Sequence, residues 1–120
     1  MLTPKDIAEL AVKTIDGKKA RDIKLLRTTD VTVLADYFVI CTANSSTQIK
    51  TLADEVEAVL EAHGETKLHR EGHHGGDWVL IDFGCVVIHL FMEEARQFYN
   101  LERLWAGADE IDISSLVIQD

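Results

Sequence analysis

The chain has 120 residues, of which 47% are hydrophobic and 28% are charged. This length and balance suit one folded domain with its own core and exclude a largely disordered chain. The formal net charge of −9 disfavours direct binding to phosphate backbones and to anionic membranes. It favours encounter with a basic protein, although many proteins are acidic only for solubility.

The N-terminal segment lacks the layout of a signal peptide, and every apolar run is too short to span a bilayer. We therefore expect a cytoplasmic protein. Cys41 and Cys85 lie in apolar, strand-like runs, which indicates reduced thiols rather than a disulfide. Their spacing does not indicate a zinc site.

Two helices are predicted in the first half of the chain. Thr3 can cap the first helix, with Pro4 at its first position, and the helix is expected to end at Gly17. Ser45, followed three residues later by Gln48, is a capping-box pattern that begins the second helix. The apolar stripe of this second helix consists of Ile49, Leu52, Ala53, Val56 and Leu60.

Three strands are predicted over residues 22–27, 37–42 and 66–71. The run YFVICT at 37–42 is β-branched and aromatic, which is typical of a central strand buried on both faces. The segment GHHGG, which follows the third of these strands, is predicted to be a loop.

Residues 78–83 and 86–91 predict a β-hairpin that turns at Gly84 and Cys85, because glycine in the first of two turn positions fits a type II′ turn. This pairing places Trp78 opposite Phe91, and side chains alternate between the two faces. One face is wholly apolar and is expected to lie under helices: Val79, Ile81, Phe83, Val86, Ile88 and Leu90. The other face is mixed: Trp78, Leu80, Asp82, Val87, His89 and Phe91.

The mixed face of the hairpin has two interpretations. Aromatic and acidic groups together suit a surface that meets a partner, whereas the alternative is a second, looser core layer. Asp82 lies diagonal to His89, and an ordinary ion pair explains that placement more simply than a catalytic acid–base pair does.

A last helix is predicted over residues 93–105, with Phe98, Leu101, Leu104 and Trp105 at helical spacing. Alternating Ile111 and Ile113 indicate a short strand or an extended segment. We therefore predict one α/β (α+β) domain over residues 1–108, with a mixed sheet of about five strands flanked by helices, and a C-terminal tail over residues 109–120.

Motifs for catalysis or cofactor binding are incomplete. A nucleotidyltransferase needs paired acids that hold magnesium near a Gly-Ser loop, but Asp36 has no paired acid, and the segment Asn44-Ser45-Ser46 lacks the glycine. A metal-dependent hydrolase would need a frame for the histidines of the glycine-rich loop. We expect no catalytic residues, no metal and no other cofactor, and the role of these histidines stays open: His69, His73 and His74, with Asp77 beside them.

Three segments together resemble one family, the ribosomal silencing factors or Iojap family. They are ADYFVICTANSSTQIKTLADEV at 35–56, WVLIDFGCVVIHLF at 78–91 and EEARQFYNLERLW at 93–105. The resemblance implies a nucleotidyltransferase-like fold without catalysis. It also implies binding to the large ribosomal subunit through ribosomal protein L-fourteen, which blocks subunit joining and represses translation when nutrients are short. A part in large-subunit biogenesis and a homodimer in isolation are further implications.

The resemblance also assigns the partner-binding residues. The family's interface tryptophan and tyrosine match Trp78 and Tyr99, and three acids match positions that would face a basic ribosomal protein: Asp82, Glu93 and Glu94. Cys85 departs from the family, which more often has an acid after this glycine. We therefore expect a binding protein and not an enzyme, with no sequence-specific nucleic-acid contact and no membrane contact.

Overall fold

The computed structural model describes residues 2–73 and 76–117. In chain order the elements are α1 (Pro4–Gly17), β1 (Arg21–Arg27), β2 (Tyr37–Ala43), α2 (Ser46–Ala62), β3 (His69–His73), β4 (Trp78–Asp82), β5 (Val86–Met92), α3 (Glu93–Tyr99), α4 (Leu101–Leu104) and β6 (Asp109–Ile111).

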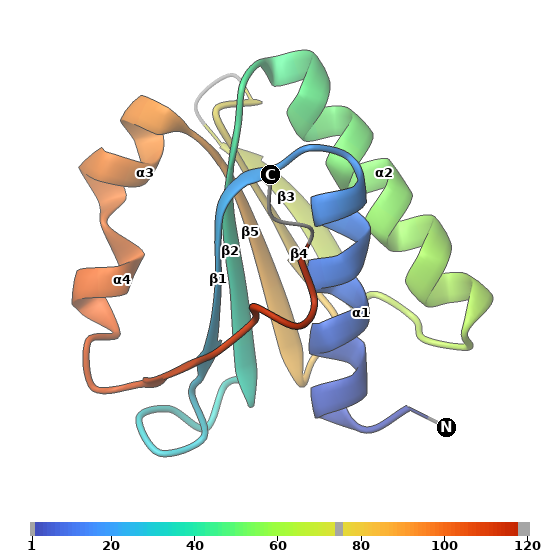
Figure 1. Ribbon diagram of the computed structural model, residues 1–120, viewed down its shortest axis with the longest axis vertical. Helices are drawn as coiled ribbons and strands as arrows, with labels where there is room; N and C mark the ends of the chain where they lie inside the picture. Colours follow the sequence, from blue (N-terminus) through green and yellow to red (C-terminus); the bar gives the residue numbers. More distant parts are fainter. Residues whose placement is uncertain (1, 74–75, 118–120) are drawn as a thin grey trace.

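A six-stranded sheet separates two pairs of helices, with α1 and α2 on one face and α3 and α4 on the other (Figure 1). The strand order is β3-β4-β5-β2-β1-β6. β2 and β5 are parallel, and the other neighbours are antiparallel. The predicted mixed sheet with flanking helices is confirmed, whereas the nucleotidyltransferase-like assignment stays a prediction.

The sixth strand comes from the predicted tail. β6 pairs with β1 in antiparallel register, with Ile111 opposite Leu25, so this part of residues 109–120 belongs to the sheet. The division of the chain at residue 108 stays a prediction.

Two apolar cores lie on opposite faces of the sheet. The larger core, under α1 and α2, contains the whole apolar face predicted for the hairpin and the predicted stripe of α2. The smaller core, under α3 and α4, contains Phe38, Ile40, Val87, Phe91 and Leu101. β2 contributes to both cores, which confirms that it is a central strand buried on both faces.

The predicted helix starts are largely confirmed. Thr3 and Asp6 form a reciprocal capping box at the start of α1. At α2 the side chain of Ser45 accepts from the backbone N–H of Gln48 at 3.1 Å, as predicted. The side chain of Gln48 completes a different set of contacts, because it accepts from the Asn44 backbone and donates to the carbonyls of Lys18 and Lys19, after α1.

The hairpin forms in the predicted register, with Trp78 opposite Phe91. The N–H of Phe83 donates to the carbonyl of Val86 at 3.0 Å. Gly84 has a φ of 88°, the positive value that the first turn position of a type II′ turn requires.

Two predicted elements have different bounds. The third of the three early strands runs from residue 69 to 73 instead of 66 to 71, because it pairs with β4 from His69 opposite Asp82 to His73 opposite Trp78. The single last helix is wrong: Asn100 adopts the left-handed conformation, with φ 47° and ψ 57°, which ends α3 and begins α4. Phe98, predicted on the apolar stripe, is 78% exposed, because α3 turns Ala95, Arg96 and Tyr99 towards the sheet.

Candidate functional site

The two predicted anchor residues, Trp78 of β4 and Tyr99 of α3, are in direct contact. Their ring centroids lie 4.7 Å apart with the planes at 42°, and Trp78 also stacks on Phe91 at 5.1 Å. Phe91 is fully buried, whereas Trp78 and Tyr99 are half-buried. Their rings therefore reach the surface from a rigid base.

Beneath this pair lies His89 of β5, which is only 4% exposed. The indole Nε1–H of Trp78 donates to Nδ1 of His89 at 3.3 Å. Burial lowers the pKa of His89 to about 3, so the imidazole is neutral at physiological pH.

The predicted ion pair between Asp82 and His89 does not form. Nδ1 of His89 accepts from Trp78, and its buried Nε2 has no hydrogen-bond partner among the residues that the structure describes. Asp82 instead accepts from the N–H of Gly84 at 2.7 Å, and its carboxylate lies 3.7 Å from Nδ1 of His69. Asp82 and His89 do not pair, because the His89 ring is buried with the smaller core whereas the Asp82 carboxylate is partly exposed.

The mixed face of the hairpin is mainly a second core layer, which was the alternative interpretation. Val87, His89 and Phe91 are buried beneath α3 and α4, and Leu80 packs against the same core. Only its Trp78 end combines partial burial with the neighbouring aromatic ring of Tyr99. The aromatic surface of the hairpin is therefore confined to that end.

The structure does not bring all three predicted acids to the aromatic pair. Glu93 and Glu94 form the exposed first turn of α3, directly after β5, at the end of the sheet where Trp78 lies. Asp82 is at the opposite end of β4, roughly 13 Å away at the usual rise per strand residue.

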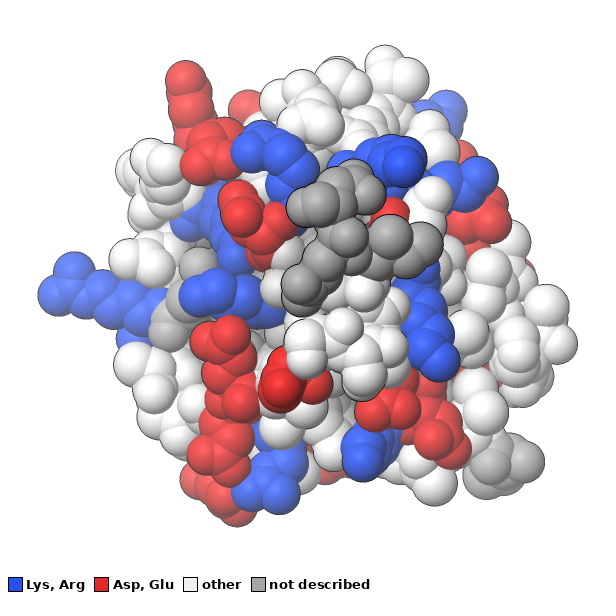
Figure 2. All heavy atoms as spheres, in the orientation of Figure 1, with Lys and Arg blue, Asp and Glu red and all other residues white. Residues whose placement is uncertain are grey.

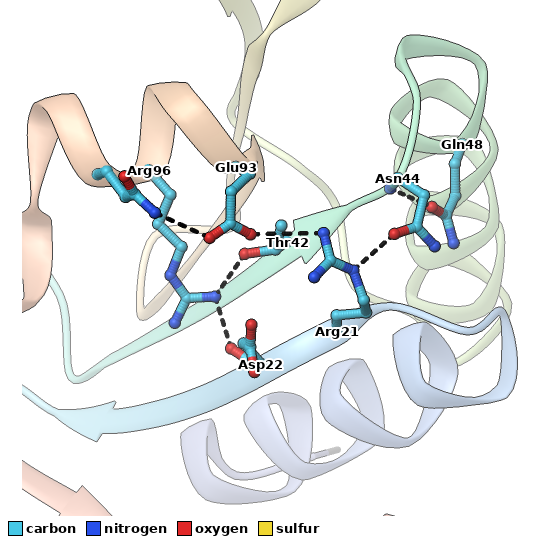
Figure 3. Close-up of polar contacts among 8 residues, drawn as sticks. Arg21, Asp22, Thr42, Asn44, Gln48, Glu93 and Arg96 are labelled. Atoms are coloured by element: carbon cyan, nitrogen blue, oxygen red, sulfur yellow. Dashed lines mark hydrogen bonds and ion pairs between the residues drawn. The ribbon is translucent and has the colours of Figure 1, made fainter.

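The side chain of Glu93 already has intramolecular partners. Its carboxylate lies 3.4 Å from Nη2 of Arg21 (Figure 3). It also accepts a hydrogen bond from the side-chain amide of Gln97 at 3.0 Å. Figure 2 shows acidic and basic side chains interspersed over one face of the molecule, so on this face the negative net charge is not gathered into a single patch.

Arg96 is a buried charged residue that the sequence pattern did not single out. Its side chain extends from α3 over β2 to β1. Its Nη1 donates to Oγ1 of Thr42 at 2.8 Å and to the carbonyl of Asp22 at 2.6 Å (Figure 3). A hollow of about 590 Å³ lies beside it, lined by both acidic and basic residues. These hydrogen bonds tie α3 to β1 and β2, so Arg96 holds the helix that carries Tyr99.

Phe98 was also missed as a surface residue. Its ring meets Tyr99 edge-on, with centroids 5.1 Å apart, and extends the aromatic surface along α3. The break after α3 had one sequence signal, Asn100, because this residue type tolerates the left-handed conformation and so can interrupt a helical stripe.

In the described part of the chain no three His, Cys, Asp or Glu residues are grouped for a metal. Nε2 of His69 lies 3.4 Å from the carboxylate of Glu71. His74 and the side chain of His73 lie outside the part of the chain that the structure describes. Cys41 and Cys85 are free, and burial raises the pKa of Cys41 to about 12, which leaves its thiol protonated. Of the helices that are described, none has the length and apolarity needed to cross a membrane.

The fold and this site define an α+β protein with an aromatic surface of the kind found at protein interfaces. The chain belongs to the ribosomal silencing factor family, because the family model described as "Ribosomal silencing factor during starvation" matches residues 2–120. This is a family of regulatory proteins, and its name indicates no catalytic activity.

Relatives and solved structures agree with this assignment. The chain is 37% identical over 112 residues to the ribosomal silencing factor RsfS of Bacillus subtilis, covering 93% of this chain and 95% of that protein. It is 30% identical to the mouse protein named "Mitochondrial assembly of ribosomal large subunit protein 1", covering 81% of this chain and 44% of that protein. A crystal structure of a Chromobacterium violaceum protein matches with a TM-score of 0.84 and 33% identity, covering 94% of this chain and 93% of that one.

Proposed function

We propose that this chain binds the large ribosomal subunit through ribosomal protein L-fourteen, blocks joining of the small subunit and so represses translation when nutrients are short. The observation that carries the proposal is the contact between Trp78 and Tyr99 at the surface of a ribosomal silencing factor. The mouse relative is named for large-subunit assembly, and this supports a further part in large-subunit biogenesis.

The aromatic pair suits a protein partner for physical reasons. Tryptophan and tyrosine dominate interface energetics because each presents a large rigid area. The Trp78 ring stacks on Phe91 and the Tyr99 ring packs against the smaller core, so little side-chain freedom remains to be lost on binding. The exposed ring of Phe98 widens the apolar surface beside them.

Charge supports a basic partner. The net charge of −9 raises the rate of encounter with a basic ribosomal protein and opposes direct binding to ribosomal RNA. Glu94 and Glu93 lie at the end of the sheet where Trp78 is found, while Asp82 would extend the interface along β4. In this proposal the protein acts in the cytoplasm, by occupying a surface and without catalysis.

The hairpin leaves less exposed apolar surface for the proposed homodimer than the sequence predicts, because α3 and α4 cover most of its mixed face. Exposed apolar side chains nevertheless remain on α3 at Phe98 and on the loop before β2 at Leu34. Light scattering at high micromolar concentration should give the mass of a dimer, and a monomer there would exclude stable self-association.

Sedimentation through a sucrose gradient tests the main proposal. The protein should migrate with purified large subunits, not with small subunits or intact ribosomes, and bound protein should reduce joining when small subunits are added. Crosslinking should capture ribosomal protein L-fourteen. Val33→Ser, on an exposed loop, is the control variant for normal binding. Equal recovery with both subunits would mean that the association is not selective.

A further inference from the structure

His89 is a polar residue in an apolar layer. Its ring lies among three aromatic rings, with centroids 5.1 Å from Phe38, 6.0 Å from Trp78 and 6.1 Å from Phe91. The side chain is almost completely buried under α3 and α4. A residue in such a place is normally aliphatic or aromatic, so the imidazole needs an explanation.

The hydrogen bond to Trp78 determines which nitrogen of His89 carries the proton. An indole Nε1–H can only donate, so Nδ1 of His89 accepts and the proton of the neutral ring is on Nε2. Nε2 is buried and has no hydrogen-bond partner. Because no described residue pairs with this donor, it destabilises the fold, and an apolar residue of similar size would avoid that penalty.

Within the described residues, the one hydrogen bond of the imidazole is therefore the bond to Trp78. We propose that His89 is a positioning residue that holds the Trp78 indole in the orientation in which it meets the ribosomal partner. The inference rests on the proposed function, since it concerns how the same aromatic surface binds.

The mechanism is preorganisation. Phe91 stacks under the Trp78 ring and Tyr99 packs beside it, and these contacts restrain the ring without depending on the direction in which its N–H points. The directional bond from Nε1 to Nδ1 selects one orientation. Binding then orders one fewer side chain, which raises affinity without any contact between His89 and the partner. Because burial keeps His89 neutral, the acceptor persists at physiological pH.

An NMR experiment on the full chain tests the hydrogen bond directly. In His89→Leu the indole N–H resonance of Trp78 should move upfield, and Trp78→Phe identifies that resonance against the one from Trp105. In Trp78→Phe, which keeps the aromatic ring, the ¹⁵N resonance of His89 Nδ1 should change because its donor is gone. This second measurement decides the question even if His89→Leu is poorly folded. Resonances that stay in place in both variants would overturn the inference.

A binding cycle tests the consequence. His89→Leu should weaken affinity for purified large subunits about fivefold, which corresponds to one oriented hydrogen bond. In the Trp78→Phe background the same change should have no further effect, because the donor is already absent. An equal loss in both backgrounds, or no loss in either, would overturn the positioning role. Failure of the wild-type protein to bind would overturn the proposed function itself, while the NMR result still reports on the hydrogen bond.

Discussion

The rings of Trp78 and Tyr99 lie 4.7 Å apart, and this contact joins the start of the hairpin to the helix that follows it. Neither ring is fully buried, so the pair contributes to the smaller core and to the surface together. Variants at these positions must therefore be measured for both folding and binding.

We expect Trp78→Ala and Tyr99→Ala each to weaken binding to the large subunit by roughly 2 kcal/mol, which is about thirtyfold in affinity. The free energy of unfolding should fall less than for Ile81→Ala, which removes a fully buried side chain of the larger core and should cost roughly 2–5 kcal/mol. If Trp78→Ala unfolds the domain while a folded Tyr99→Ala binds normally, the contact surface lies elsewhere.

Phe98→Ser separates binding from stability most cleanly. Because the ring is mostly exposed, the free energy of unfolding should change by no more than about 0.5 kcal/mol. Affinity for the large subunit should fall by about 1 kcal/mol, since the ring extends the Trp78–Tyr99 surface. Val33→Ser, which also removes an exposed apolar side chain, is the matched control. Identical affinities of the two variants would place Phe98 outside the interface.

Arg96→Met should destabilise the fold by roughly 2–3 kcal/mol, because the buried hydroxyl of Thr42 and the carbonyl of Asp22 lose a charged donor. Denaturant unfolding measures this loss, with the exposed Arg103→Met as the control. Adding Thr42→Val should recover part of the stability, because it removes a group left without its partner. A double variant that is destabilised by the sum of both single changes would argue against this coupling.

His89 makes stability depend on pH. Its folded pKa of about 3 lies below the ordinary value of 6.5, so below pH 6.5 the unfolded chain takes up a proton that the folded chain does not. Stability should therefore fall as the pH is lowered towards 3, by about 2 kcal/mol between pH 7 and pH 5 from this group. The free energy of unfolding of His89→Leu, measured at pH 7 and at pH 5, should lack that contribution. The same pH dependence in variant and wild type would show that His89 is not responsible.

Salt should weaken binding, because charges at an interface rim are screened. Glu94→Gln should reduce affinity by no more than about 1 kcal/mol and should reduce the salt dependence, since an exposed charge contributes mainly to encounter. Asp82→Asn, measured in parallel, shows whether the interface extends along β4. If salt leaves the affinities of the wild type, Glu94→Gln and Asp82→Asn unchanged, charge steering is excluded.

Local features of this chain were predictable from the sequence because neighbouring residues determine them. The cap at Thr3, the buried strand at 37–42 and the hairpin turn at Gly84 each depend on backbone chemistry within a few positions. Alternation along the hairpin also separated its apolar face correctly from its mixed face. The family resemblance, which the family model confirms, named Trp78 and Tyr99 without showing that they touch.

Tertiary structure alone decided the remaining features. The left-handed conformation of Asn100 interrupts the last helix although the apolar spacing continues through the break, and Phe98 lies on the outward side of α3. The partner of His89 is Trp78 and not Asp82, because α3 and α4 bury one end of the mixed face and leave the other partly in water. Residue spacing determines which side chains share a face, but the elements packed on that face determine which of them are buried and which polar atoms remain to pair.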